Sequence, residues 1–439
     1  MSARFTPEMK KTHTILVPDM LPVHFQLLIS ILKPYGYNCE LLRTASRVVV
    51  DEGLKNVHND TCYPALLVIG QFMEALKSGR YDPNRTALLI TQTGGGCRAS
   101  NYIHLLRKAL AEQFPQVPVI SLNFSGLEKD PGSGWQMTPT IFLKCLYAVL
   151  YGDLLMLVAN QCRPYELQRG ATDKLLLTWQ RRLEKAFQSR DYLHTKRFYK
   201  RILDEFAAIP RTARNKIRVG IVGEIYVKYS PLANNHLEDF LLSENCEPVI
   251  PSLLEFVMYC AISTAVDGKL YHFFDKNVMY NGLGYKAIYA MQKQQINAVK
   301  KHGVFDPPHD FEHLRDRADK YISQGVSMGE GWLITAEMAA LVETGTENII
   351  CTQPFGCLPN HIVAKGMMRV IKNAYPDANI TAIDYDPGAT RVNQENRVKL
   401  MLANARQPKG CVQMIFSVPD STSAAISAVM SQPSPMLTP

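Results

Sequence analysis

A cysteine follows three glycines in the stretch Gln-Thr-Gly-Gly-Gly-Cys97-Arg-Ala-Ser-Asn-Tyr. The apolar run Thr86 to Gln92 predicts a buried strand, and the run Ile103 to Gln113 has the spacing of a helix. Cys97 is therefore expected in the turn between a strand and a helix. Free N–H groups and the helix dipole favour anions there and lower the pKa of a thiol. This position suits a thiolate, either as a nucleophile or as a metal ligand.

Two other turns repeat this arrangement. Cys62 precedes the helical run Ala65 to Lys77, and the proline at position 64 is tolerated in a first helical turn. Cys351 and Cys357 bracket a turn that begins as the end of a strand and finishes as the start of a helix. In open α/β sheets, ligands bind beyond the carboxyl ends of the strands. Four of the ten cysteines lie at such turns, so we predict that they form one site.

The composition indicates a globular protein of two or three domains. The chain has 439 residues, of which 46% are hydrophobic. Charged side chains interrupt the longest apolar run, 141–162, so it predicts a buried helix and no membrane contact. The first residues contain no signal-peptide core, which favours the cytoplasm. Thiols stay reduced there, and the cysteines then indicate metal binding or catalysis over disulfides.

The net charge of +8 comes from one segment. Residues 163–216 contain 14 Lys and Arg against 6 Asp and Glu. The segment has helical spacing, which predicts that most of this charge forms a solvated face. The alternative is a docking face for an acidic protein or a phosphate-bearing cofactor. No nucleic-acid-binding motif accompanies it, so we expect no nucleic acid partner.

Strands and helices alternate along the chain, which predicts an α/β fold with two doubly wound, mostly parallel sheets. We expect a first α/β domain over residues 1–162, a basic helical linker over 163–216 and a second α/β domain over 217–416. A helical insertion is expected at 253–343 and a disordered tail at 417–439. The run Arg47 to Val50 predicts a further short extended piece.

Six motifs stand in order along the chain and together resemble one family. They are Asn-Asp-Thr-Cys62-Tyr-Pro-Ala, Gln-Thr-Gly-Gly-Gly-Cys97-Arg-Ala-Ser-Asn-Tyr, Gly223-Glu-Ile-Tyr-Val, Gly329-Glu-Gly-Trp, Gln-Pro-Phe-Gly-Cys357-Leu-Pro-Asn-His and Ile383-Asp-Tyr-Asp-Pro-Gly-Ala. Over residues 8 to 406 the chain resembles the component family of the 2-hydroxyacyl-CoA dehydratases. Its motifs are most similar to the branch found in large fusions with ATP-dependent activases and to the double-cubane cluster proteins.

The resemblance implies an iron–sulfur cofactor, either a [4Fe-4S] cluster or a double-cubane [8Fe-9S] cluster, held between α/β domains. Its ligands would be Cys62, Cys97 and one or both of Cys351 and Cys357. A separate activase would hydrolyse ATP and supply one low-potential electron, because this chain has no phosphate-binding loop. The substrate would be a small molecule or an acyl-CoA, with dehydration of an (R)-2-hydroxyacyl-CoA through a ketyl radical as one outcome. A second copy or a homologous subunit would complete an oxygen-sensitive dimer.

Several neighbours of the cysteines are expected to support this chemistry. The glycines Gly94, Gly95 and Gly96 would let backbone N–H groups approach sulfide, and Ser100 could bind the cofactor, although helix capping explains Ser100 equally well. Glu330 is a candidate acid or base, against the simpler interpretation that it belongs to a turn, and His361 is a candidate proton donor, against a role in a helix cap or in surface packing. Glu224, which follows the turn at Gly223, is a further candidate.

Two functions of other classes stay open from the residues. The chain could be a non-catalytic subunit that supports a cluster-bearing homologue through its basic helices. It could also be a cytoplasmic protein that binds zinc through thiolates. The content of iron and sulfide distinguishes both from an iron–sulfur reductase or lyase.

Overall fold

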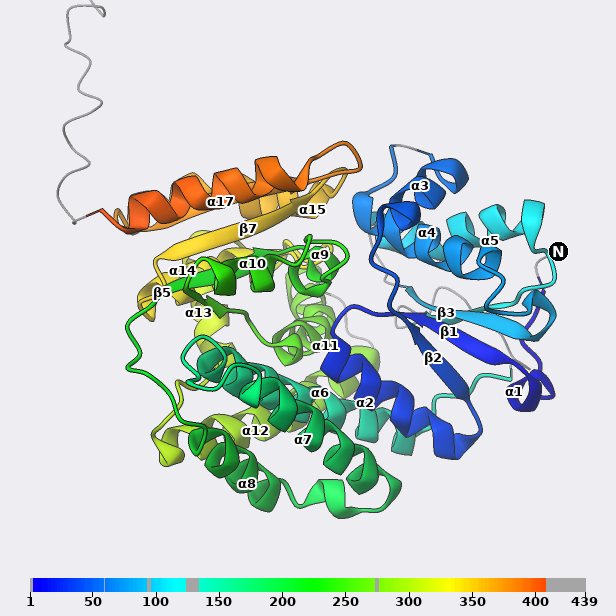
Figure 1. Cartoon of the computed structure of the whole chain (residues 1–439), viewed down its shortest axis with the longest axis horizontal. Coiled ribbons are helices and arrows are strands. Elements are labelled where there is room, and N and C mark those ends of the chain that lie inside the picture. Colours follow the sequence, from blue (N-terminus) through cyan, green and yellow to red (C-terminus); the bar gives the residue numbers. More distant parts are fainter. Residues whose placement is uncertain (1–2, 59, 93–95, 124–133, 273–275, 408–439) are drawn as a thin grey trace, which may run out of the picture.

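Two sheets of four parallel strands form the framework of the computed structural model, which describes residues 3–58, 60–92, 96–123, 134–272 and 276–407. The first sheet has the order β2 (Asn38–Leu42), β1 (Thr14–Pro18), β3 (Thr86–Gln92), β4 (Val119–Asn123), and the second has the order β6 (Cys246–Val249), β5 (Ile217–Gly223), β7 (Asn348–Pro354), β8 (Asn379–Tyr385). All neighbouring strands in both sheets run parallel. The expected α/β fold is confirmed. Figure 1 shows the first sheet on the right and the second at the upper left.

The two sheets share one strand order. In each, the first strand in sequence pairs with both the second and the third. The chain therefore reverses direction across the sheet between β1 and β3, and again between β5 and β7. Such a reversal opens a crevice at the carboxyl ends of these strands, where ligands bind in α/β proteins.

Helices make up most of the remaining described chain. Those before the second sheet are α1 (Met9–Thr12), α2 (Pro22–Leu32), α3 (Arg47–Asn56), α4 (Tyr63–Lys77), α5 (Tyr102–Gln113), α6 (Pro139–Cys162), α7 (Ala171–Gln188) and α8 (Thr195–Ala207). Those that follow are α9 (Ile225–Tyr229), α10 (Leu237–Ser243), α11 (Leu253–Leu270), α12 (Lys276–His302), α13 (Phe311–Tyr321), α14 (Trp332–Glu343), α15 (Leu358–Asn360), α16 (Met368–Ala374) and α17 (Arg391–Ala405).

The extended piece predicted from Arg47 to Val50 is wrong, because these residues begin the helix α3. The run of β-branched residues favours a strand locally, but Val49 and Val50 are buried in the core that α4 also joins. The two helices pack closely at Gly70, where an added Cβ would lie 2.0 Å from the carbonyl oxygen of Val49. Tertiary packing therefore decided the conformation of this segment.

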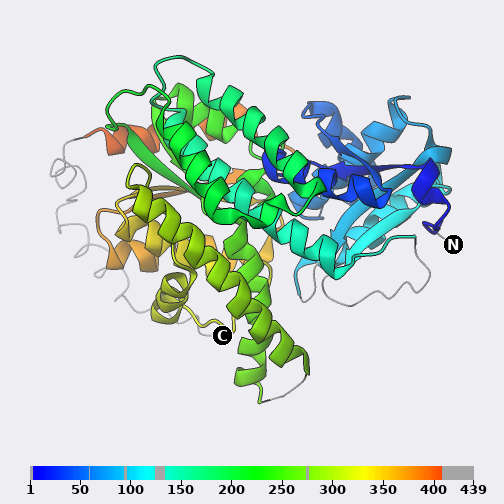
Figure 2. The same cartoon turned by 90° about the horizontal axis from the view of Figure 1, so that it is seen from below.

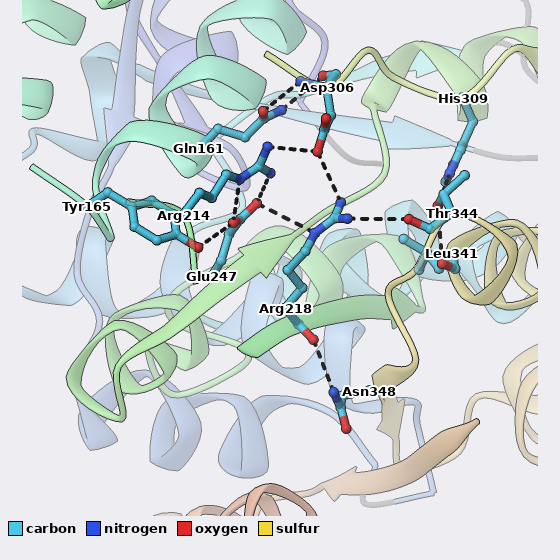
Figure 3. A network of polar contacts seen from close by, with 10 residues as sticks. All are labelled: Gln161, Tyr165, Arg214, Arg218, Glu247, Asp306, His309, Leu341, Thr344 and Asn348. Carbon is cyan, nitrogen blue, oxygen red and sulfur yellow. Dashed lines mark hydrogen bonds and ion pairs between the residues drawn. The ribbon is translucent and has the colours of Figure 1, made fainter. Parts of the chain in front are cut away.

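The basic segment forms α7 and α8, and its buried apolar side chains pack in one core with α6 and the first sheet. Beyond α8, Arg214 forms ion pairs with two carboxylates, Glu247 on β6 and Asp306 after α12. Tyr165 donates its hydroxyl to the same Glu247 at 2.8 Å, and Arg218 on β5 joins the network. Figure 3 shows these side chains converging. Part of the positive charge of the basic segment, at Arg214, therefore forms ion pairs that hold the segment against the second sheet.

Helix α6 is long and apolar enough to cross a membrane by length and composition alone, among the described residues. In this fold 56% of its apolar window is buried, as expected for a helix of a protein core. The predicted buried helix is thus confirmed. In the predicted insertion, α11 and α12 lie side by side and project from the body (Figure 2). The predicted tail, 417–439, lies outside the described residues.

Candidate functional site

The turns that carry Cys62, Cys97 and Cys357 meet between the two sheets. The backbone N–H of Tyr63, at the start of α4, donates to the carbonyl of Phe355 after β7 at 3.0 Å. The guanidinium of Arg98 donates to the carbonyl of Asp60 at 2.6 Å. These bonds connect the start of α4 with the turns that follow β3 and β7.

Two glycines permit this close approach. Gly356 has a positive φ of 71°, and a Cβ at this position would lie 3.1 Å from Cα of Cys62. Gly329 has a φ of 61°, and a Cβ there would lie 3.9 Å from Sγ of Cys97 and 3.0 Å from the ring of Pro359. A side chain would be strained at both positions. The loop before α14 therefore borders the same site as the three turns.

Each of these cysteines directly precedes a helical turn. Cys62 is the N-cap of α4, Cys97 precedes a 3₁₀ turn over Arg98–Asn101, and Cys357 is the N-cap of α15. Cys62 and Cys357 are buried, and Cys97 is half-buried. The Sγ atom of Cys62 lies 2.8 Å from the hydroxyl of Tyr102. The sequence thus predicted the local setting of all three thiols correctly.

The predicted lowering of the thiol pKa is wrong for the chain without a bound metal. Burial raises the pKa of Cys97 to about 12 and also raises the pKa of Cys62 and Cys357. The carboxyls of Glu224 and Glu330 add to the effect at Cys97 and Cys357, because negative charge nearby disfavours a thiolate. A metal centre would reverse this balance, since a coordinating thiol is deprotonated.

The two carboxyls come from facing loops of the second half. Glu224 follows β5, and its Oε2 accepts the N–H of Val227 at 2.8 Å. Glu330 precedes α14, and its Oε1 accepts the N–H of Ile225 at 2.9 Å. Both side chains are buried, and burial raises the pKa of both carboxyls. The structure therefore brings two candidate acids, named from the sequence, into electrostatic contact with the thiols.

Cys351 has different surroundings from Cys62, Cys97 and Cys357. It sits within β7, fully buried in an apolar core formed with α14 and α16. Its Sγ lies 3.6 Å from Oδ1 of Asn360, and the amide of Asn360 donates to the carbonyl of Thr352 at 2.7 Å. In this structure Cys351 is thus a packing residue, whereas Cys357, six positions later, borders the site.

Some of the other predicted site residues contact the turns of the site, and others do not. Ser100 donates its hydroxyl to the carbonyl of Cys97 at 2.8 Å and so stabilises the turn. A Cβ on Gly96 would lie 2.4 Å from Sδ of Met328, so a larger residue would displace that side chain. Gly94 and Gly95 lie outside the described residues. The side chain of His361 is exposed, and its backbone N–H donates to Cys357.

In the part of the chain that the structure describes, no three or more Cys, His, Asp or Glu side chains lie close enough together to bind one metal ion. An iron–sulfur cluster distributes its thiolate ligands over several irons, so these thiols do not have to meet at a single point. Three thiols at helix starts, beside glycine backbone, fit the ligands and N–H donors that such a cluster needs.

Asp19 is a partly buried acid that the sequence did not single out. It follows β1, which is the position that Glu224 takes after β5 in the second sheet. Burial raises the pKa of Asp19 to about 6, and Asp19 is an electrostatic neighbour of Tyr226 on α9. The carboxylate after the first strand was visible in the sequence, but only the shared strand order shows that its position is equivalent to that of Glu224.

We expect Asp19→Asn to stabilise the protein at neutral pH. Folded Asp19 keeps its proton up to about pH 6, whereas an unfolded Asp loses it near pH 4. Stability therefore falls as the pH rises from about 4 to 6, and the loss persists above that range. Urea unfolding should show a gain of about 2 kcal/mol at pH 7.5, allowing for partial exposure, and little gain at pH 4. Asp316→Asn, at an exposed position on α13, is the control; equal gains at both pH values would contradict this explanation.

Comparisons with known proteins add no relative: no protein-family model matches the chain, and no curated protein matches its sequence. Function is therefore inferred from the chain's own residues and their arrangement.

Proposed function

We propose that this protein is an iron–sulfur redox enzyme that receives a low-potential electron and passes it to a small substrate. The observation that carries the proposal is the convergence of Cys62, Cys97 and Cys357 from turns at both sheets. These three thiolates would hold the cluster between two doubly wound α/β domains. Cys351 would contribute only to packing.

The residues around the thiols suit a negatively charged cluster. Helix starts at Cys62 and Cys357 direct backbone N–H groups toward the site, and N–H donors to sulfur raise the potential of a cluster. When bound, the cluster would supply one electron at low potential. By resemblance, a separate ATP-hydrolysing activase would deliver that electron, and the substrate would be a 2-hydroxyacyl-CoA or another small molecule.

Glu224 and Glu330 would act as proton donors and acceptors at the same site. Burial raises the pKa of Glu224 to about 8 and also raises the pKa of Glu330, which favours protonated carboxyls that could release a proton to a substrate that has gained negative charge. Their carboxyl oxygens are oriented by backbone N–H groups of α9. We further propose that the protein works in the cytoplasm as a homodimer or beside a homologous subunit.

Anaerobic purification followed by iron and sulfide analysis tests this function. We expect a brown protein with at least about four irons per chain and the absorption spectrum of an iron–sulfur cluster. A colourless, iron-free protein that cannot be reconstituted with iron and sulfide would contradict the proposal. Zinc in place of iron would favour the thiolate-zinc alternative.

A further inference from the structure

A group of buried acidic side chains extends from the site of Cys62, Cys97 and Cys357, here called the cysteine site, to the helices α6, α11 and α14. They come from five different elements or loops and are at most 8% exposed: Asp153, Glu224, Glu255, Glu330 and Glu337. Two basic side chains are buried among them, Lys228 at 3% exposure and His24 at 1%. The group thus contains more acids than bases, in a region from which water is largely excluded.

Lys228 lies in the middle of this acidic group, where it forms an ion pair with Glu337. Its Nζ lies 3.1 Å from Oε1 of Glu337, between α9 and α14, and 4.8 Å from the ring centroid of Tyr229. Glu330 at the cysteine site and Glu255 on α11 are both electrostatic neighbours of Glu337. Among the described residues, Oε2 of Glu255 has no hydrogen-bond partner.

The opposite end of the group reaches a cavity. Oδ1 of Asp153, on α6, lies 2.9 Å from Nε2 of His24, and the same carboxylate accepts two N–H groups at the start of α11. Asp153 is in turn a neighbour of Glu255. His24 and Tyr229 line a cavity of about 210 Å³ that also contacts the exposed side chains of His236 and Asp239. The buried acids therefore extend from the thiols to water.

Packing alone does not explain why so many acidic side chains are buried in one group. Replacing a buried ion pair by apolar residues of similar volume is often neutral or stabilising, so stability does not require these charges. Several ionised carboxylates would also repel one another strongly at low dielectric. Burial raises the pKa of Glu255 and Glu337 and so favours the protonated form of both carboxyls, whereas the charge of Lys228 opposes this shift. A row of protonatable groups has the chemistry of a proton relay.

We propose that Asp153, Glu255, Glu337 and Lys228 form a proton path from the cavity at His24 to Glu330 at the cysteine site. This inference rests on the proposed function. Each electron that enters the site adds one negative charge, and one proton from water in the cavity moves along the path onto the carboxylate of Glu330, so that the added charge is balanced. Water molecules can bridge the gaps between neighbouring carboxyls.

An infrared comparison in H₂O and D₂O tests whether the path carries protons at rest. Protonated carboxyl groups give bands that shift on deuteration, and we expect Glu255→Gln to remove one such band. Glu52→Gln is the matched control, because Glu52 is a buried acid held by Lys55 and Lys77 outside the path. Carboxyl bands that stay unchanged in Glu255→Gln would overturn the proposal.

Proton uptake during reduction tests the transfer itself. Titanium(III) citrate reduces the anaerobic protein, and a pH-indicator dye follows uptake in weak buffer. We expect one proton per electron in every variant, about 10- to 100-fold slower in Glu255→Gln at unchanged iron content, and unslowed in Glu52→Gln. Uptake at the wild-type rate in Glu255→Gln would overturn the path. Glu255→Asp, which keeps the acid, should restore the rate and controls for misfolding.

The two arms separate this inference from the proposed function. Absence of iron would contradict the proposed function, and the infrared arm needs no iron. Loss of the carboxyl band in Glu255→Gln would then still support a chain of protonated acids, and unchanged bands would still overturn it.

Discussion

Serine at position 97 is expected to remove most of the protein's iron. Cys97 lies on the turn after β3, and a hydroxyl is a far weaker ligand for iron than a thiolate. The sulfur borders the loop at Gly329, so the replacement fits the available space. Iron and sulfide analysis after anaerobic purification, with the visible absorption spectrum, measures the loss. We expect the same result for Cys62→Ser and Cys357→Ser.

Cys351→Ser, in the strand β7 that leads to the turn of Cys357, is the matched control. Cys351 is buried in an apolar core, so we expect iron content to stay near that of the wild type. A hydroxyl in this core should instead cost about 1–3 kcal/mol of unfolding free energy. If Cys351→Ser loses iron while Cys357→Ser retains it, the assignment of ligands is wrong.

Lys228→Met should cause the largest loss of stability among single substitutions in the buried acidic group. Lys228 and Glu337 are 3% and 1% exposed and lie 3.1 Å apart. Removal of one partner of a buried ion pair leaves a buried charge without compensation, which costs about 3–5 kcal/mol. Urea unfolding at pH 8 measures this loss. The loss should be smaller at pH 5, because Glu337 can then take up a proton.

Two further variants check the cause of that loss. Lys228→Met combined with Glu337→Gln removes both charges and should recover much of the stability. Lys200→Met breaks an exposed pair with Asp204 and should cost less than about 1 kcal/mol. An equal loss in Lys228→Met and in the double variant would mean that packing of the lysine side chain, and not its charge, is responsible.

Local sequence patterns predicted the elements that have regular spacing. The strand before Cys97, the helix after Cys62 and the long apolar helix 141–162 were all predicted close to their observed bounds. Helix α17, over Arg391–Ala405, was not predicted, because its first half is mostly polar and its buried apolar side chains, Val398, Met401 and Leu402, lie in its second half. Patterns fail where the buried side chains are few.

By itself, the sequence determined the parallel α/β character and the position of three cysteines at helix starts, since strand and helix periodicity and turn residues act over a few neighbours. Only the tertiary structure decided that both sheets share one strand order, which brings Cys62, Cys97 and Cys357 together and places Asp19 and Glu224 equivalently. It also placed Cys351 in the core and the acids around Lys228 in one buried group. The burial of these side chains, the repulsion between their charges and the shifts of their pKa values depend on residues far apart in the chain, so no local sequence pattern can predict them.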